Sequence, residues 1–198
     1  DFGKHIIPAA IEKLNVFAHT FDGYWADIGT ISAFYRANLE LTDAEPRFSF
    51  YQPDVPIFTH QRFLAGTRMH GCRVDHGIVS EGCTMVDAEV EQSVVGVRTV
   101  LRAGVRLYQS VVMGADVYES DADRERNAER GVPDIGIGSG SVIHRAIIDK
   151  NARIGEGVII SNDGRVAEAD GDGYHIREGI VVIPKDAVIE KGGKPSTS

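Results

Sequence analysis

The feature that most constrains this chain is an aliphatic residue that recurs every six positions. Val142, Ile148, Ile154 and Ile160 are in step with one another, and glycine follows aliphatic residues at several of these repeats. Short strands of this period wind into triangular coils, and a single coil cannot bury its own aliphatic side chains, so the coils must stack. The sequence therefore predicts a parallel β-helix.

The main alternative fold is an antiparallel sandwich of short valine-rich strands. A sandwich would show turn signals about every 8–12 residues and no fixed step. The chain instead keeps its six-residue step and holds 22 glycines against 7 prolines, as corners between short strands require. These features favour the β-helix.

Two segments interrupt the repeat. Residues 116–134 contain a run of charged side chains, and residues 161–178 contain Asn-Asp-Gly and Asp-Gly-Asp-Gly. Composition of this kind predicts loops in both places. The last residues, 194–198, are polar and terminal, and we expect them to be disordered.

The N-terminal third has a different texture. We expect a short helix over residues 9–14, a strand over residues 16–21, and a second helix from residue 31, where apolar side chains recur at helical spacing. Thr30 or Ser32 can cap that helix. Prolines and aromatics then alternate up to residue 66, which predicts an extended connector held down by its aromatic side chains.

Bulk composition excludes several classes of protein. The net charge of −8 makes general nucleic-acid binding unfavourable, and no apolar run approaches membrane-spanning length. There is no signal-peptide pattern at the start, and Cys72 and Cys83 are too few for a disulfide framework. We therefore expect reduced thiols, a cytoplasmic protein, and neither a membrane nor a nucleic-acid partner.

The first residues carry the most specific motifs. Residues 25–30, Trp-Ala-Asp-Ile-Gly-Thr, resemble the W-x-D-x-G-T signature of sugar nucleotidyltransferases, and residues 1–8 resemble the segment upstream of it in the glucose-1-phosphate adenylyltransferase family. The likeness continues through five further segments, residues 48–51, 78–83, 93–96, 112–116 and 146–155. It therefore covers almost the whole chain.

This resemblance implies a domain plan. Residues 1–45 would be the C-terminal tail of a catalytic α/β nucleotidyltransferase domain, and residues 46–66 the extended connector. Residues 67–193 would be a left-handed parallel β-helix that serves regulation and oligomerisation. The fold class expected is thus mainly β, with a short α/β remnant before it.

The resemblance also implies a reaction. The family forms ADP-glucose and pyrophosphate from ATP and glucose 1-phosphate, with Mg²⁺, for glycogen or starch synthesis. Asp27 matches a metal-binding, catalytic carboxylate, although it could instead cap the following helix. Asp1, Phe2 and Trp25 match positions in the glucose-phosphate pocket, although Trp25 could also be a core residue.

Two features depart from the family pattern. His5 stands where the family usually has aspartate, and no stretch resembles the glycine-rich phosphate loop G-G-x-G-T-R-L. We therefore expect these 198 residues, taken alone, to be inactive in adenylyl transfer.

The family is allosteric, and its effectors are anions such as sugar phosphates or phosphoglycerate. Lys150 and Lys185 match positions that bind activator, and Arg153 and Arg177 lie in or near the same motifs. Ammonium and guanidinium groups both grip phosphate. The alternative is that these four are ordinary surface charges of little individual effect.

Two other functions stay open at this point. A hexapeptide-repeat acyltransferase would need a catalytic histidine, for which His70, His76 and His144 are available, but it leaves residues 25–30 unexplained. A non-catalytic regulatory or scaffolding subunit would explain the missing phosphate loop. For partners, the resemblance implies a homotetramer, located in the cytoplasm, or in the plastid if the source is a plant.

Overall fold

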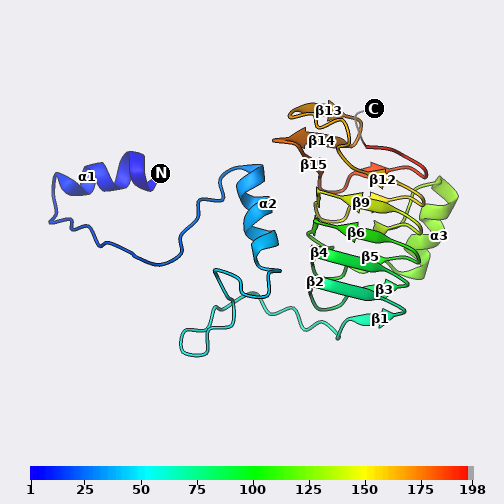
Figure 1. Cartoon of the computed structure of the whole chain (residues 1–198), viewed down its shortest axis with the longest axis horizontal. Helices are drawn as coiled ribbons and strands as arrows, with labels where there is room; N and C mark the ends of the chain where they lie inside the picture. The colour runs from blue at the N-terminus through cyan, green and yellow to red at the C-terminus, as the bar shows by residue number, and fades with distance from the viewer. Residues whose placement is uncertain (196–198) are drawn as a thin grey trace.

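A computed structural model describes residues 1–195 and shows a stack of strands with helices outside it (Figure 1). The helices are η1 (Phe2–Ile6, a π-helix), α1 (Ile7–Ile11), α2 (Ile31–Glu40) and α3 (Asp121–Arg130). The strands are β1 (Arg68–His70), β2 (Arg73–Val79), β3 (Thr84–Val86), β4 (Glu89–Val95), β5 (Val100–Leu101), β6 (Arg106–Tyr108), β7 (Val111–Val112), β8 (Gly136–Ile137), β9 (Val142–His144), β10 (Ala146–Ile148), β11 (Arg153–Ile154), β12 (Ile159–Ile160), β13 (Ala169–Gly171), β14 (Tyr174–Arg177), β15 (Ile180–Ile183) and β16 (Val188–Ile189).

The strands wind into a parallel β-helix. One face is a six-stranded sheet in the order β1-β3-β5-β8-β11-β16. The other faces belong to a single ten-stranded sheet, because β4 pairs with β6 through its first half and with β7 through its second half. Between the halves, Gln92 has a φ of 44°, and His76 has a φ of 48° at the equivalent bend of β2. The predicted fold class is confirmed.

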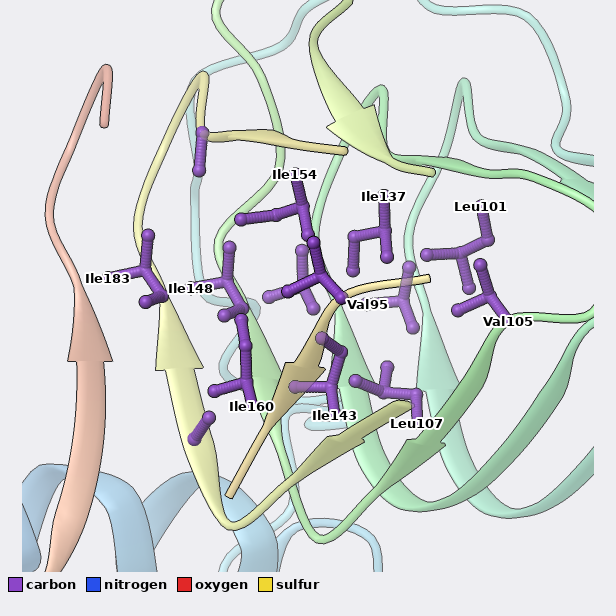
Figure 2. Close-up of a cluster of buried hydrophobic side chains, with 14 of the residues drawn as sticks. Val95, Leu101, Val105, Leu107, Ile137, Ile143, Ile148, Ile154, Ile160 and Ile183 are labelled. Carbon is purple, nitrogen blue, oxygen red and sulfur yellow. The ribbon is translucent and has the colours of Figure 1, made fainter. Parts of the chain in front are cut away.

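The inside of the coils is aliphatic. Side chains from successive strands point toward one another within the stack, among them Leu107, Ile143 and Ile160, each with no measurable exposure (Figure 2). Complete burial of such a side chain stabilises the fold by about 1.5–3 kcal/mol. The six-residue period thus places one aliphatic residue per strand into this core.

Serines fill the buried corners. Ser110 and Ser141 are fully buried, and the Ser141 hydroxyl donates to the Gly155 carbonyl oxygen at 3.0 Å and accepts from the Val158 amide at 3.1 Å. Each such hydroxyl satisfies backbone groups where the chain turns out of a strand, which a buried aliphatic side chain could not do.

Helix α2 lies against the outside of the β-helix (Figure 1). Thr30 caps it by accepting from the Ala33 amide at 3.2 Å, as predicted. On its inner side Tyr35 is buried against Val111, Ile147 and Ile180 of three adjacent strands. This contact covers an apolar patch on the outer face of the ten-stranded sheet.

The N-terminal segment differs from the prediction. Helical structure covers Phe2–Ile11, earlier than the expected 9–14, and no strand forms over residues 16–21. A strand needs a neighbour that accepts its backbone hydrogen bonds. Every paired strand of the described chain begins at or after Arg68, and none of them pairs with residues 16–21. The Phe17 side chain of this unpaired segment is exposed.

Residues 46–66 contain no helix or strand, and their aromatic side chains do not hold them down. Phe50, Tyr51 and Phe58 are exposed, and Phe48 packs edge-on against Phe50 with ring centroids 5.1 Å apart. Among the described residues, neither hydrophobic cluster includes an aromatic residue of this connector. The prediction that aromatic side chains hold this connector down was therefore wrong. The coils bury their own aliphatic side chains internally, and α2 covers the apolar patch on the outside of the sheet.

Both interruptions of the repeat contain regular structure, which corrects the loop predictions. Helix α3 occupies part of residues 116–134, where Ser120 and Asp123 form a reciprocal capping box and Gly131 ends the helix with a φ of 66°. Strands β13 and β14 form an antiparallel hairpin within residues 161–178 and extend the sheet beyond β15.

The remaining predictions concern the thiols, the tail and membrane spans. Cys72 and Cys83 are both free cysteines. Of the tail predicted at 194–198, Lys194 and Pro195 have no helix or strand, and residues 196–198 lie outside the described residues. In the part of the chain that the structure describes, no helix has the length and hydropathy needed to cross a bilayer.

Candidate catalytic and anion-binding sites

Asp27 lies in the irregular segment that leads into α2. Its Oδ1 accepts a hydrogen bond from the Gly29 amide at 2.8 Å, a local turn that fixes the carboxylate. It does not cap the helix, since Thr30 holds that position. Its exposed carboxylate keeps Oδ2 without a hydrogen bond among the described residues.

The other substrate-site candidates do not meet Asp27. Asp1 accepts from the Lys4 amide at 2.7 Å and so caps η1, and Phe2 follows it with its ring exposed. Trp25 is 77% exposed, so it is not a core residue. Within residues 1–195, no hydrogen bond or ion pair joins Asp1 or Phe2 to Trp25 or Asp27.

The donor set at Asp27 suits Mg²⁺ in a limited way. Residues 1–195 hold no group of three or more His, Cys, Asp or Glu side chains arranged for a metal. Mg²⁺ is commonly bound through one or two carboxylates together with water and substrate phosphates. A single fixed carboxylate with a free oxygen fits one such ligand position.

Lys150 and Lys185 occupy matching places in adjacent coils. Ile148 of β10 pairs with Ile183 of β15, and each lysine lies two residues beyond its strand partner. The Asp186 amide donates to the Lys150 carbonyl oxygen at 3.0 Å, which continues the register past the strands. Adjacent strands are about 4.8 Å apart, so the two lysines stack on one edge of the β-helix.

Asp116 joins the two lysines. Its Oδ1 accepts from Lys150 Nζ at 2.8 Å, and its Oδ2 accepts from Lys185 Nζ at 2.8 Å. Lys150 first, and then Lys185, hold the pKa of the Asp116 carboxyl far below its usual range, and Asp116 in turn raises the pKa of Lys185. One carboxylate therefore bridges two stacked ammonium groups.

Asn151 fixes this arrangement from the next position. Its Oδ1 accepts from the Asp116 amide at 2.8 Å, and its Nδ2 donates to Asp116 Oδ2 at 3.2 Å and to Asp186 Oδ1 at 3.0 Å. Asp149 also lies close by, where it accepts from the Lys150 amide at 2.7 Å. We call Asp116, Asp149, Lys150, Lys185 and Asp186 the lysine-pair site.

The structure does not bring Arg153 and Arg177 to Asp116. Arg153 pairs with Glu119 at 2.8 Å and donates to the Pro133 carbonyl oxygen at 2.8 Å, so it anchors both ends of the segment that carries α3. Arg177 pairs with Asp170 at 2.6 Å within the β13–β14 hairpin. Both arginines have structural partners of their own.

Sequence reasoning missed the acidic half of this site. Asp116 lies 34 residues before Lys150 and 69 residues before Lys185, so spacing alone gave no sign of contact. One signal was available: matching aliphatic pairs, Val111–Val112 and Ile147–Ile148, lie shortly before Asp116 and Lys150 and stand in register. Aligning the coils on these pairs puts Ala115 opposite Asn151, one residue before Asp116.

The histidines considered for acyl transfer lie apart from one another. His70 is at the end of β1, and His76 bends β2 and contacts Asp75 at 2.8 Å. His144 ends β9 and lines an open cavity of about 540 Å³ on the face formed by β6, β9 and β12. None belongs to the lysine-pair site.

Comparison with known families matches this layout of the chain. Residues 62–193 match the family described as the GLGC left-handed parallel beta-helix domain, and residues 1–44 match the family described as nucleotidyl transferase. A left-handed β-helix joined to such a segment defines a sugar nucleotidyltransferase. The chain belongs to the GLGC family, and the two matches fit the C-terminal portion of a glucose-1-phosphate adenylyltransferase.

Proposed function

We propose that the chain is part of an enzyme that forms ADP-glucose and pyrophosphate from ATP and glucose 1-phosphate, in the cytoplasm or plastid. Support comes from the two family matches together with the Trp25-Ala26-Asp27-Ile28-Gly29-Thr30 motif, which lies within the nucleotidyl transferase match. In such transfers catalysis rests on positioning and on neutralising phosphate charge rather than on covalent chemistry.

Asp27 is the residue proposed to hold Mg²⁺. When bound, the metal would neutralise and orient phosphate oxygens. The Gly29 amide fixes the Asp27 carboxylate through Oδ1, which keeps Oδ2 available as a hard oxygen ligand. Asp1, Phe2 and Trp25 are proposed to bind the glucose 1-phosphate, with the two exposed rings offering apolar surface to the sugar.

Residues 1–198 carry no glycine-rich phosphate loop of the G-G-x-G-T-R-L type. We therefore expect this chain alone to form no ADP-glucose from ATP, glucose 1-phosphate and Mg²⁺. A coupled assay of pyrophosphate release tests this directly. If the purified chain forms ADP-glucose, the proposal that binding of the ATP phosphates needs residues outside these 198 is wrong.

The lysine-pair site is proposed to bind an anionic effector such as a sugar phosphate or phosphoglycerate. The observation that carries this is the convergence of Lys150 and Lys185 on the two oxygens of one carboxylate. A phosphoryl group presents oxygens at similar spacing and would accept from both ammonium groups. The Asp116 carboxylate is therefore where we propose that the effector anion binds.

Substitution in the full-length enzyme tests the effector site. Lys185→Ala is expected to raise the activator concentration for half-maximal stimulation by about tenfold, the usual effect of losing a charge-assisted hydrogen bond, without changing the basal rate. Lys191→Ala is the matched control, since Lys191 is also exposed and pairs with Glu156 at 2.7 Å, away from Asp116. Equal loss of basal and stimulated rates in Lys185→Ala would contradict the assignment.

Arg153 and Arg177 were predicted to share this site, and we now propose a lesser role for them. Arg153 contacts Glu119, which lies three residues after Asp116 and leads into α3, so it would act on the effector site through that segment. The β-helix is further proposed to assemble the enzyme as a homotetramer. Light scattering on the purified full-length enzyme would measure the subunit number.

A further inference from the structure

The lysine-pair site already contains an anion that belongs to the chain itself. Asp116 supplies both oxygens of its carboxylate to Lys150 and Lys185, each at 2.8 Å. Its side chain is 37% exposed, and it begins the segment that carries α3 rather than a strand of the stack. A rotation of this one side chain would break both ion pairs.

The charges around the lysine pair also disfavour anion binding while Asp116 is in place. The site gathers two lysines and three carboxylates, since Asp149 and Asp186 flank the lysine pair. With Asp116 in place, an arriving anion meets no net positive charge, and the Asp116 carboxylate already takes one N–H donor from each ammonium group. An anion that bridges both ammonium groups therefore has to take the position that Asp116 now holds.

We propose that Asp116 is an internal competitor of the effector, and that the site selects ligands which replace a bidentate carboxylate with the oxygens of a phosphoryl group. This inference rests on the effector site proposed above. The threshold for effector binding is therefore set by the strength of the Asp116 contacts.

Displacement of the Asp116 side chain would affect the backbone segment that leads from Asp116 into α3. The segment that follows it is held by Tyr118, whose hydroxyl donates to the Gly82 carbonyl oxygen at 3.0 Å, and by the Glu119–Arg153 pair. Release of the Asp116 side chain removes its contacts with both lysines and leaves the Asp116 amide bonded to Asn151 Oδ1 as the first anchor of this segment. Effector binding is thus expected to loosen the backbone just before α3.

The test is calorimetric titration of the 198-residue chain with 3-phosphoglycerate in low-salt buffer. Asp116→Asn keeps the shape of the side chain but lowers its competition, and we expect binding to tighten about three- to tenfold, as two exposed ion pairs allow. Asp121→Asn is the matched control, because it removes one negative charge from the chain, as Asp116→Asn does, but at a position on α3. Among the described residues, Asp121 forms an ion pair only with Arg124. The effect of Asp121→Asn is expected to stay below about twofold.

Different failures are distinguishable. If Lys185→Ala weakens 3-phosphoglycerate binding while Asp116→Asn leaves it unchanged or weaker, the competitor inference is wrong and the effector site stands. If neither Lys150→Ala nor Lys185→Ala weakens binding, both ideas are wrong. Hydrogen exchange gives a second readout: 3-phosphoglycerate should speed exchange at residues 116–119 of the wild-type chain, and slower exchange there would show that Asp116 assists binding instead.

Discussion

The Tyr35 hydroxyl donates a hydrogen bond of 2.6 Å to the carbonyl oxygen of Gln109. Tyr35 lies within the segment that matches nucleotidyl transferases, and Gln109 lies at a corner of the matched β-helix. The bond, together with the apolar contacts of Tyr35, fastens α2 to the stack. The two family segments are therefore physically coupled at this helix.

Removing that hydroxyl tests the coupling. Tyr35→Phe is expected to lower the free energy of unfolding by about 0.5–1.5 kcal/mol, the usual net value of one hydrogen bond. Urea unfolding followed by circular dichroism measures it. Tyr51→Phe is the control, since Tyr51 is 92% exposed and should show no change.

The same residue predicts a dependence on alkaline pH. Burial raises the pKa of Tyr35, so the folded chain keeps its proton at pH values where the unfolded chain, with an ordinary pKa of about 10, has lost it. The unfolded state then binds fewer protons, and stability falls as pH rises above about 10. Tyr35→Phe should fall less steeply, and an identical slope would show that this tyrosine does not cause the loss.

Neighbouring isoleucines on β12 provide a matched test of the core. Ile160 points into the coil and has no measurable exposure, whereas Ile159 is 39% exposed. Ile160→Ala should cost about 2–5 kcal/mol of unfolding free energy through lost burial and a residual cavity. Ile159→Ala should lower the unfolding free energy much less. Equal losses would contradict the assignment of Ile160 to the buried face and Ile159 to the exposed face.

Glycines at the stacked corners are expected to tolerate no side chain. A Cβ on Gly138 would lie 2.5 Å from the backbone carbonyl carbon of Gly155 in the next coil, closer than atoms can approach. Gly138→Ala should therefore destabilise the chain by about 1–3 kcal/mol or more, as overpacking does. Gly66→Ala, where a Cβ meets nothing within 4 Å, is the control. Thermal unfolding of both variants would compare them.

Glu119 is expected to hold the α3 segment in place. Its side chain is 8% exposed, pairs with Arg153 and accepts from the Ile135 amide at 2.8 Å. Glu119→Gln keeps the shape but removes the charge, so a loss of about 1–3 kcal/mol and faster hydrogen exchange across α3 are expected. Glu125→Gln, an exposed change on α3 itself, should have little effect. Unchanged exchange in Glu119→Gln would contradict this anchoring role.

Periodic features of the sequence predicted the fold well. The six-residue step and the helical spacing around Phe34 and Leu39 both report burial on one face, and the structure buries those faces. Helix α3 was missed because it presents almost no apolar face, although Ser120 and Asp123 already formed a capping pattern. The strand at 16–21 was overpredicted because a short apolar run says nothing about whether a pairing partner exists.

The candidate site was only partly predictable. Lys150 and Lys185 were identified from motifs, and their closeness follows from the register of β10 and β15. The role of Asp116 could not be predicted from spacing, because its distance along the chain includes the whole α3 segment. Contacts across such insertions depend on coil stacking, which a local pattern does not encode.

Because the coils stack, the distance between Lys150 and Lys185 does not depend on how many residues lie between them in the chain. The β13–β14 hairpin lies in the chain between Lys150 and Lys185, yet the register of Ile148 with Ile183 brings the lysines onto neighbouring rungs. Backbone hydrogen bonds between coils hold these rungs at a fixed rise. Insertions or deletions within the hairpin could therefore accumulate over evolution while the two ammonium groups keep the same separation.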